Sequence, residues 1–406
     1  MKRWILPILA ILLIASGVLL SGMAAERFQT GEAAVDENVI LEPEIDGESV
    51  DVAEEEFEPE PSSLRIIAVG DIMFHIPQIN SAADEEGGFN FEPPFTFVKS
   101  YIDEADIAIA NLETVIASSG GPYRGFPRFN SPVETLDALK STGFDILTTA
   151  NNHTLDQGKT GLINTINEIE KRNFVQIGTS KTERKDYEIV EKNGISIAFF
   201  AYTYGLNGLD SLLSKDELST MVNLIDKDRM ADSILQARAE GAELIVVSLH
   251  WGYEYHTRAS TIQRDLAEFL INNGTDIILG SHPHVVQEVE LLETETNTGL
   301  VIYSMGNFIS NQRYETMGVS ATENGLMVMI DIEKDLITEN IEITSITPLV
   351  TWVDRYETNG KYDYRIVPIE EALSGNLDMN LTDGKEAKLK KSLEEINSLI
   401  DENITF

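Results

Sequence analysis

Apolar and polar positions along residues 64–282 alternate in a way that predicts strands and helices in turn. Short apolar runs of the kind that form buried strands are separated by segments whose apolar residues recur at helical spacing. The strand-like runs are residues 65–70, 106–111, 145–151, 195–202, 243–250 and 276–282, and the helix-like segments are 132–143, 159–173, 230–241 and 261–274. Glycine follows or ends the helix-like segments at Gly143, Gly241 and Gly274, as expected of helix stops. This alternation is typical of an α/β domain.

The pattern changes after residue 284, where strand-like runs follow one another with little helix between them. These runs are residues 285–293, 299–308, 325–333 and 339–352. We therefore expect a second, mostly antiparallel sheet. Near the C-terminus one helical face of residues 385–400 is apolar, which predicts a helix that closes the core. Its residues are Leu389, Leu393, Ile396 and Ile400.

The N-terminal segment predicts a membrane anchor. Lys2 and Arg3 precede an uncharged stretch from Trp4 to Ala25, and a membrane span takes about 20 apolar residues. Positive charge before this stretch and acid after it indicate a single-pass membrane protein whose body faces the outside of the cell. Small residues around Gly22 also permit cleavage as a signal peptide, which would give a secreted protein. The length of the apolar stretch favours the anchor, because signal cores usually have only about 7–15 residues.

Acidic residues dominate the chain, whose formal net charge is −38. Residues 32–60 hold thirteen acidic residues and no Lys or Arg. We interpret residues 26–63 as a disordered acidic linker between the anchor at 1–25 and a folded domain at 64–355, with a C-terminal extension at 356–406. Nucleic acid is excluded as a partner, because its binding depends on basic side chains that displace counterions.

All six histidines lie just beyond strand-like runs, at positions 75, 153, 250, 256, 282 and 284. Ligands collect at the carboxyl ends of strands in α/β sheets, so side chains from separate runs can converge there. The chain has no cysteine, and a metal would therefore be held by nitrogen and oxygen. The strongest signal is Gly280-Ser281-His282-Pro283-His284, in which we expect the glycine to permit a sharp strand exit. This histidine pair can serve two metals or clamp one.

Hard oxygen donors occupy the same strand ends. Asp71 follows the first run, Glu113 the second, and Asn152 stands beside His153 after the third. His153 is a candidate acid or hydrogen-bond donor. His75 and His256 lie a few residues beyond their strands. Each is consistent with one of two roles: a side chain that contacts the substrate or a metal-binding residue, or an ordinary polar residue in a loop.

Six motifs, in this order, carry a resemblance to a known family: GDIMFH, NLET, TTANNHTLDQG, SLHWGYEY, GSHPHVVQ and YSMGNF. They resemble the CapA family of capsule-synthesis proteins, which includes the poly-γ-glutamate synthesis factor of Gram-positive bacteria. The match covers residues 64–308, with weaker likeness to residue 352. That family is in turn similar to the calcineurin-like metallophosphoesterases. The resemblance implies their four-layer αββα sandwich, two sheets flanked by helices.

The resemblance also implies a divalent metal site of one or two ions, with Mn, Fe or Zn as candidates. The implied ligands are Asp71, Glu113, Asn152, His250, His282 and His284. His153 would be the catalytic histidine, acting with Asp71, and Asn307 would line the same cleft. The chain departs from the wider superfamily at Met73, where Asp-x-His is expected, and at Glu113, where a shorter Asp usually bridges two ions. His75 is a candidate replacement for the missing histidine, and the number of ions stays open.

Arg124 and Arg128 lie in a loop rich in Gly and Pro, residues 120–132, that has no strand or helix pattern. Two guanidinium groups on one loop can bind carboxylates or phosphates through paired hydrogen bonds. They fit a substrate-binding role, and they equally fit surface arginines paired with neighbouring acids.

Three functions are consistent with the sequence. The first is a membrane-anchored, outward-facing protein that helps to synthesise, export or attach an anionic polymer such as poly-γ-glutamate through a hydrolase-like metal site. The second is a general extracellular metallophosphodiesterase. The third is a non-catalytic scaffold that partners the subunits of a membrane synthase. The sequence contains no Walker phosphate loop, no GxGxxG after a strand and no GxSxG elbow.

Overall fold

A strand that is apolar on both faces lies at the centre of the fold. The computed structural model describes residues 60–117, 120–358 and 360–404. In it, β1 (Ser62–Ile72) directs Ile66 and Ala68 into one apolar core, and Ile67 and Val69 into another. Successive side chains of a strand point to opposite faces, so β1 lies between two apolar layers. This double burial explains the unbroken apolar run in the sequence.

The first sheet has eight strands and combines parallel and antiparallel pairs. Its order is β14 (Lys361–Pro368), β13 (Ile341–Thr358), β12 (Asn324–Lys334), β1, β2 (Ile107–Leu112), β3 (Ile146–Thr148) and β4 (Val175–Ile177), with β11 (Asn307–Ile309) beside β1. The strands from β1 to β4 pair in parallel, and the pairs from β1 through β12 and β13 to β14 are antiparallel.

The second sheet has six strands with a parallel centre. Its order is β5 (Tyr187–Lys192), β6 (Ile195–Thr203), β7 (Leu244–His250), β8 (Ile277–Ser281), β10 (Thr298–Ile302) and β9 (Val289–Glu293). The strands β6, β7, β8 and β10 pair in parallel, and only the edge strands β5 and β9 are antiparallel to their neighbours.

The strand-rich C-terminal half does not form the separate antiparallel sheet that its pattern predicts. Instead, β9 and β10 extend the second sheet beyond β8, whereas β12, β13 and β14 extend the first sheet beyond β1. The exposed edge of a sheet can form hydrogen bonds with a further strand that runs parallel or antiparallel to it. In this protein β10 joins the edge of β8, and β12 joins the edge of β1. The runs themselves are strands, and the error concerns their partners.

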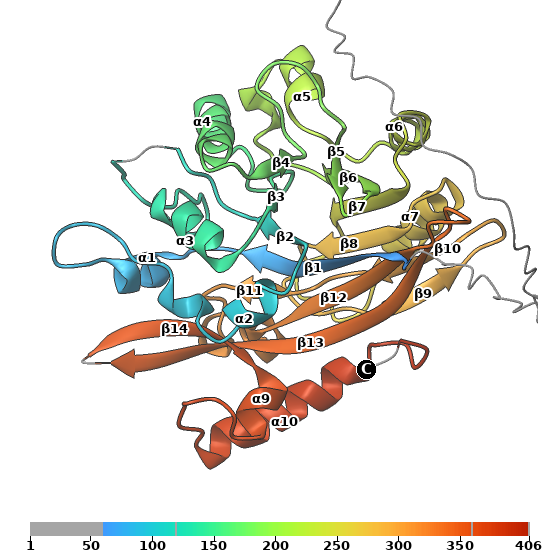
Figure 1. Cartoon of the computed structure of the whole chain (residues 1–406). Coiled ribbons are helices and arrows are strands. Elements are labelled where there is room, and N and C mark those ends of the chain that lie inside the picture. The colour runs from blue at the N-terminus through green and yellow to red at the C-terminus, as the bar shows by residue number, and fades with distance from the viewer. Residues whose placement is uncertain (1–59, 118–119, 359, 405–406) are drawn as a thin grey trace, which may run out of the picture. The chain divides into compact units, whose positions relative to one another are not determined.

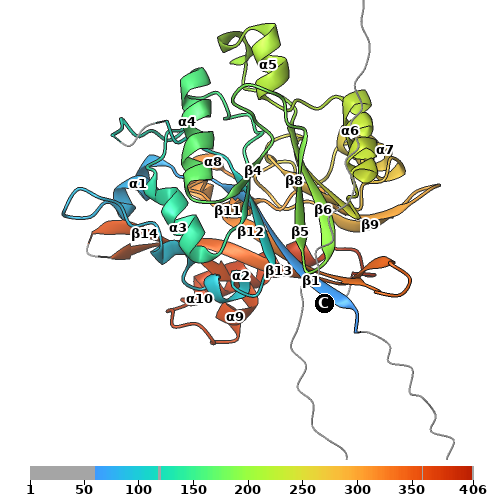
Figure 2. The ribbon, with the colours of Figure 1, turned by 45° about the horizontal axis from the view of Figure 1, so that its top comes forward.

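Helices cover the outer face of each sheet. The helices of the described residues are α1 (Ile76–Ala82), α2 (Lys99–Ile102), α3 (Glu134–Thr142), α4 (Gly158–Lys171), α5 (Lys215–Met221), α6 (Lys227–Ala239), α7 (Thr261–Asn272), α8 (Tyr314–Met317), α9 (Ile369–Leu373) and α10 (Asp383–Asn397), of which α9 and α10 contact the core between the sheets instead. Leu136 of α3 packs on the first sheet, and Met230 of α6 and Leu270 of α7 pack on the second. Figure 2 shows α3 and α4 on one side, α6 and α7 on the other, and the sheets between them. The order of layers is therefore helix, sheet, sheet, helix, as predicted.

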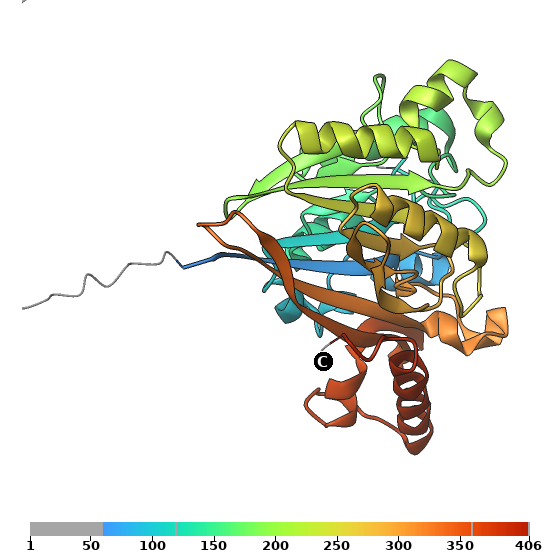
Figure 3. The same cartoon turned by 90° about the vertical axis from the view of Figure 1, so that its right-hand side faces the viewer.

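The segment predicted to close the core contains α10. Leu389, Ile396 and Ile400 are buried in the core between the sheets, and Ile400 forms a backbone bridge with Val289. Figures 1 and 3 show α9 and α10 below the strands β12 and β13. Lys388 of α10 also pairs with the buried carboxylate of Glu323. The helix is thus held by both apolar contacts and charge.

The first strand of the described residues, β1, starts at Ser62, two residues before Leu64, where the folded domain is predicted to begin. The predicted anchor, residues 1–25, and residues 26–59 of the predicted acidic linker lie outside the described residues. Among the helices that the structure describes, none is both long enough and apolar enough to cross a bilayer.

Candidate metal centre

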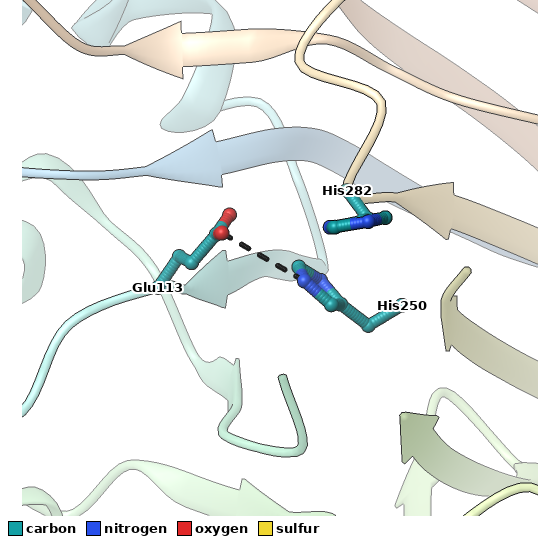
Figure 4. A group of neighbouring side chains, drawn as sticks. All are labelled: Glu113, His250 and His282. Atoms are coloured by element: carbon teal, nitrogen blue, oxygen red, sulfur yellow. Dashed lines mark ion pairs between the residues drawn. The ribbon is translucent and has the colours of Figure 1, made fainter. Parts of the chain in front are cut away.

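The implied metal ligands meet at the carboxyl ends of strands from both sheets. Asp71 and Asn111 are partners across β1 and β2, and His250 and Ser281 are partners across β7 and β8. The two sheets present these ends to each other, so ligands that lie far apart in the sequence become neighbours. Figure 4 shows Glu113, His250 and His282 around a common space.

The carboxylate of Glu113 is the centre of this cluster. It is fully buried, and its Oε1 atom accepts no hydrogen bond from the described residues. The Nε2 atoms of His250, His284 and His153 lie 3.7, 3.8 and 3.9 Å from Oε1. These distances are too long for hydrogen bonds but match the spacing of ligands that share an ion at about 2.0–2.2 Å from each. Glu113 therefore lies where it could share an ion with His250 and His284.

The remaining ligands are oriented by hydrogen bonds. Asp71 accepts from Asn111 at 2.8 Å through Oδ1, and its Oδ2 lies 3.0 Å from Nδ1 of His284. His250 contacts Ser281 Oγ through Nδ1 and Asn152 Oδ1 through Nε2, both at 3.0 Å. Such contacts fix the ring planes of histidines that bind metals.

The electrostatics of the centre favour a bound cation. Burial, followed by the nearby charge of Asp71, raises the pKa of Glu113 well above its usual value. Burial and the neighbouring histidines lower the pKa of His250, and they lower that of His282 to about 3. The imidazoles of His250 and His282 are therefore neutral at pH 7, the form that binds metals, and the raised pKa of Glu113 reflects a buried carboxylate whose negative charge no described cation compensates. A divalent cation would supply the compensating charge.

Backbone strain gathers at the same place. His282 and His284 have φ angles of 97° and 59°, and Tyr255 on the facing loop has a φ of 66°. Such angles are uncommon outside glycine and are found preferentially at functional sites. Gly280 plays a different part from the one predicted: it lies within β8, and a Cβ there would stand 2.0 Å from the carbonyl oxygen of Tyr303. It allows close packing, and the histidines themselves make the turn.

The residues present fit a divalent metal. Two overlapping groups, Glu113 with His250 and His282, and Asp71 with Glu113 and His284, each bring ligand atoms within 4.8 Å of one another. All five side chains are buried. Nδ1 of His282 also lacks a hydrogen-bond partner among the described residues. Nitrogen and carboxylate oxygen together suit Zn, Mn or Fe.

Residues 65–312 match the model of a family described as "Bacterial capsule synthesis protein PGA_cap". The chain belongs to this family. It is 27% identical over 313 residues to the capsule biosynthesis protein CapA of Bacillus anthracis, covering 73% of this chain and 72% of that protein. It is 30% identical over 278 residues to the PGA biosynthesis protein CapA of Bacillus subtilis (strain 168), covering 68% and 64% respectively.

Three solved structures are similar to this one. The calcineurin-like phosphoesterase YfkN of Bacillus subtilis has a TM-score of 0.41 at 14% identity, covering 83% of this chain and all (100%) of that one. A phosphatase of Mycoplasma pneumoniae has a TM-score of 0.42 at 15% identity, covering 72% and 95%. The NAD nucleotidase of Haemophilus influenzae has a TM-score of 0.45 at 13% identity, covering 84% and 60%. These values are too low to carry a conclusion about activity.

The predicted catalytic histidine has a partner that the sequence reading did not assign. Nδ1 of His153 lies 2.8 Å from Oδ2 of Asp156, which also accepts from the backbone N–H of Phe129 at 2.6 Å. The ring of Phe129 packs edge-on against His153, with centroids 4.7 Å apart. These contacts leave Nε2 of His153 directed at Glu113. The spacing of three residues between His153 and Asp156, in the turns that precede α4, is the signal that would have revealed the pair.

The other predicted substrate residues surround the cluster at varying distance. Asn307 is buried and pairs with Asp71 in the register of β11 and β1, but its amide donates to Gln312 and Thr322. His75 packs edge-on against Phe129 at 5.2 Å. His256 is exposed, and its ring lies next to that of Tyr253, with centroids 5.5 Å apart. Neither His75 nor His256 belongs to a group of potential metal ligands in the part of the chain that the structure describes.

Arg124 and Arg128 are both exposed, and among the described residues neither pairs with a carboxylate. This favours anion recognition over the alternative of surface ion pairs. Their loop reaches the site through Phe129, which follows Arg128 directly and contacts His153. Phe126 of the same loop is 72% exposed. The loop therefore offers two guanidinium groups without a carboxylate partner among the described residues, and its Phe129 contacts the predicted catalytic histidine.

Proposed function

We propose that this protein acts at the outer face of the cell membrane in the synthesis, export or attachment of an anionic capsule polymer, through a metal-dependent hydrolase-like site. The observation that carries the proposal is the buried Glu113 carboxylate with three imidazole Nε2 atoms at 3.7–3.9 Å, in a chain of the capsule-synthesis family. Poly-γ-glutamate is the polymer we favour, since one similar protein is described as a PGA biosynthesis protein.

In this proposal, substrate activation, proton transfer and substrate binding are carried out by different residues. When bound, a divalent ion would polarise a phosphoryl or carbonyl oxygen of the substrate. Asp156 holds Nδ1 of His153, so Nε2 is the atom that exchanges a proton with the leaving group. Arg124 and Arg128 bind carboxylates or phosphates of the polymer, because the −38 charge of the chain repels an anion elsewhere.

Location and partners are part of the same proposal. An anchor at residues 1–25 holds the domain outside the cell, and the acidic stretch that follows keeps it away from the anionic membrane surface. Subunits of a membrane synthase are the expected protein partners.

Complementation of a strain that lacks the gene tests the proposal. The full chain and its His250→Ala and His284→Ala variants are expressed at equal levels, and cell-bound and released polymer are measured. His256→Ala is the matched control, because His256 is an exposed histidine outside the cluster. We expect the control to restore the polymer and both cluster variants to fail. Full restoration by both would favour the non-catalytic scaffold, and normal polymer in the deletion strain would refute the capsule function.

A further inference from the structure

Tyr204 lies at the edge of the metal centre, directly after β6. Thr203 and His250 are partners in the register of β6 and β7, and the backbone N–H of Tyr204 donates to the carbonyl oxygen of His250 at 3.0 Å. On its other side, the N–H of Thr203 donates to the carbonyl oxygen of Asn223, and its carbonyl oxygen accepts from the N–H of Ile225, both at 2.9 Å. The backbone therefore fixes the place of Tyr204 beside His250.

The ring of Tyr204 packs on two histidines of the centre. Its centroid lies 4.6 Å from that of His282 and 6.3 Å from that of His250, with an interplanar angle of 11° to the latter. Both histidines are buried, whereas Tyr204 is 48% exposed. A tyrosine can bury its ring against neighbouring side chains and keep its polar tip in water. Tyr204 thus lies between the buried ligands and the solvent from which a substrate enters.

The hydroxyl of Tyr204 has a donor beside it and a proton to give. It interacts with the side chain of Asn152, whose other end, Oδ1, lies 3.0 Å from Nε2 of His250. The hydroxyl therefore faces the amide nitrogen of Asn152. A tyrosine hydroxyl both accepts and donates, so an amide N–H on its oxygen leaves its own proton for another acceptor. In the described chain, no residue accepts that proton.

We propose that the Tyr204 hydroxyl donates a hydrogen bond to a negatively charged oxygen of the substrate, which makes Tyr204 a substrate-binding residue. A hydrogen bond to an ionised oxygen is about twice as strong as one between neutral groups, and both phosphates and carboxylates supply such an oxygen. A tyrosine that only covered the histidines would not need its hydroxyl, because phenylalanine packs the same ring. This inference rests on the proposed function and extends it to a group that orients the substrate.

The loop of residues 120–132 and Tyr204 contact different histidines of the centre. Phe129 of the loop packs on His153, whereas Tyr204 packs on His282. The guanidinium groups of the loop are exposed and supply long-range attraction for an anion, which salt weakens. The Tyr204 hydroxyl carries no charge, so its contribution is a directed hydrogen bond that depends little on ionic strength.

Binding of two small anions tests the inference without relying on turnover. The full chain, purified in mild detergent and loaded with Mn²⁺, is titrated calorimetrically with inorganic phosphate and, separately, with γ-glutamylglutamate. We expect Tyr204→Phe to bind about tenfold more weakly, because it keeps the ring and loses only a donor to a charged group. A loss confined to phosphate assigns the bond to a phosphoryl oxygen, a loss confined to the dipeptide assigns it to a carboxylate, and a loss for both assigns it to either kind of anionic oxygen.

The control is Tyr362→Phe, which removes the hydroxyl of a 51% exposed tyrosine on β14 and should leave both affinities unchanged. The melting temperature and Mn²⁺ content of Tyr204→Phe should equal those of the wild type, because the ring still packs on His282. Wild-type affinity of Tyr204→Phe for both anions would overturn the inference, as would a wild type that binds neither. Loss of Mn²⁺ from Tyr204→Phe would overturn it too, because the residue would then act through the ligands. The capsule function is judged separately, by polymer in cells.

Discussion

Oδ2 of Asp156 lies 2.8 Å from Nδ1 of His153, and this contact gives the histidine a fixed orientation inside the cleft. The same carboxylate oxygen accepts the N–H of Phe129, whose ring packs on the histidine. His153 is thus held from two sides, with Nε2 left free to face Glu113. A histidine that only filled space would not need two independent supports.

Asp156→Asn should therefore lower turnover of a chromogenic phosphodiester by the Mn²⁺-loaded protein. We expect kcat to fall about 10–100-fold, the usual cost of losing the partner that orients a functional histidine, while KM changes little. His153→Ala should cost more, about 10²–10⁴-fold. The matched control is Asp216→Asn, an exposed aspartate on α5. Wild-type kcat in Asp156→Asn would contradict the assigned role, and a wild type without turnover would count against hydrolase chemistry on phosphodiesters.

The half-buried position of His75 predicts a pH-dependent loss of stability. Burial lowers the pKa of this residue from 6.5 to about 4, so the unfolded chain binds a proton in this range that the folded chain does not. The contribution of the neutral His75 ring to the free energy of unfolding is complete above pH 6.5. It is lost as the pH falls towards 4, and the loss is at most roughly 3 kcal/mol. We expect the stability difference between wild type and His75→Gln, measured by urea unfolding, to shrink over this interval. A difference that stays constant would contradict a His75 that is neutral in the folded protein.

The free guanidinium groups predict anion binding that depends on salt. Arg124→Ala and Arg128→Ala should each weaken binding of soluble poly-γ-glutamate about tenfold at low ionic strength, because each removes a charged hydrogen-bond donor. Arg229→Ala is the control, since Arg229 is also exposed and has no carboxylate partner among the described residues. Isothermal titration at two salt concentrations gives the affinities. Equal losses in all three variants would show that only the total charge matters.

The buried carboxylate of Glu323 is expected to hold the C-terminal helix in place. It is 1% exposed and pairs with Arg313 at 2.5 Å and with Lys388 of α10. Glu323→Ala leaves two cations without a partner and should lower the free energy of unfolding by about 3–5 kcal/mol. Glu315→Ala removes a surface carboxylate 3.7 Å from Arg355 and should cost less than about 1 kcal/mol. Similar urea midpoints for the two variants would contradict the prediction.

The sequence predicts the strand ends well and the contacts between loops poorly. The sequence identifies Asp71, Glu113 and His250 as neighbours for two reasons. Each lies at or just after the end of a buried apolar run that predicts a strand, and the carboxyl ends of parallel strands lie at the same edge of a sheet. The strands β9 to β13 are predicted as strands but assigned to a wrong, separate sheet, because an apolar run does not identify the sheet that it joins, and β14 has no counterpart in the prediction. The role of Asp156 was not assigned, because the spacing of three residues to His153 permits a contact but does not show that the two side chains turn towards each other, and the contact with the N–H of Phe129 joins residues 27 positions apart.

The central claim is that the buried cluster around Glu113 binds a divalent metal. Its most direct test is the metal content of the full chain purified without chelator, measured by plasma mass spectrometry beside the His284→Ala and His256→Ala variants. We predict near-stoichiometric Mn, Fe or Zn in the wild type and in His256→Ala, and a marked loss in His284→Ala. A wild-type protein that holds no metal, even after incubation with each of these ions, would contradict the claim.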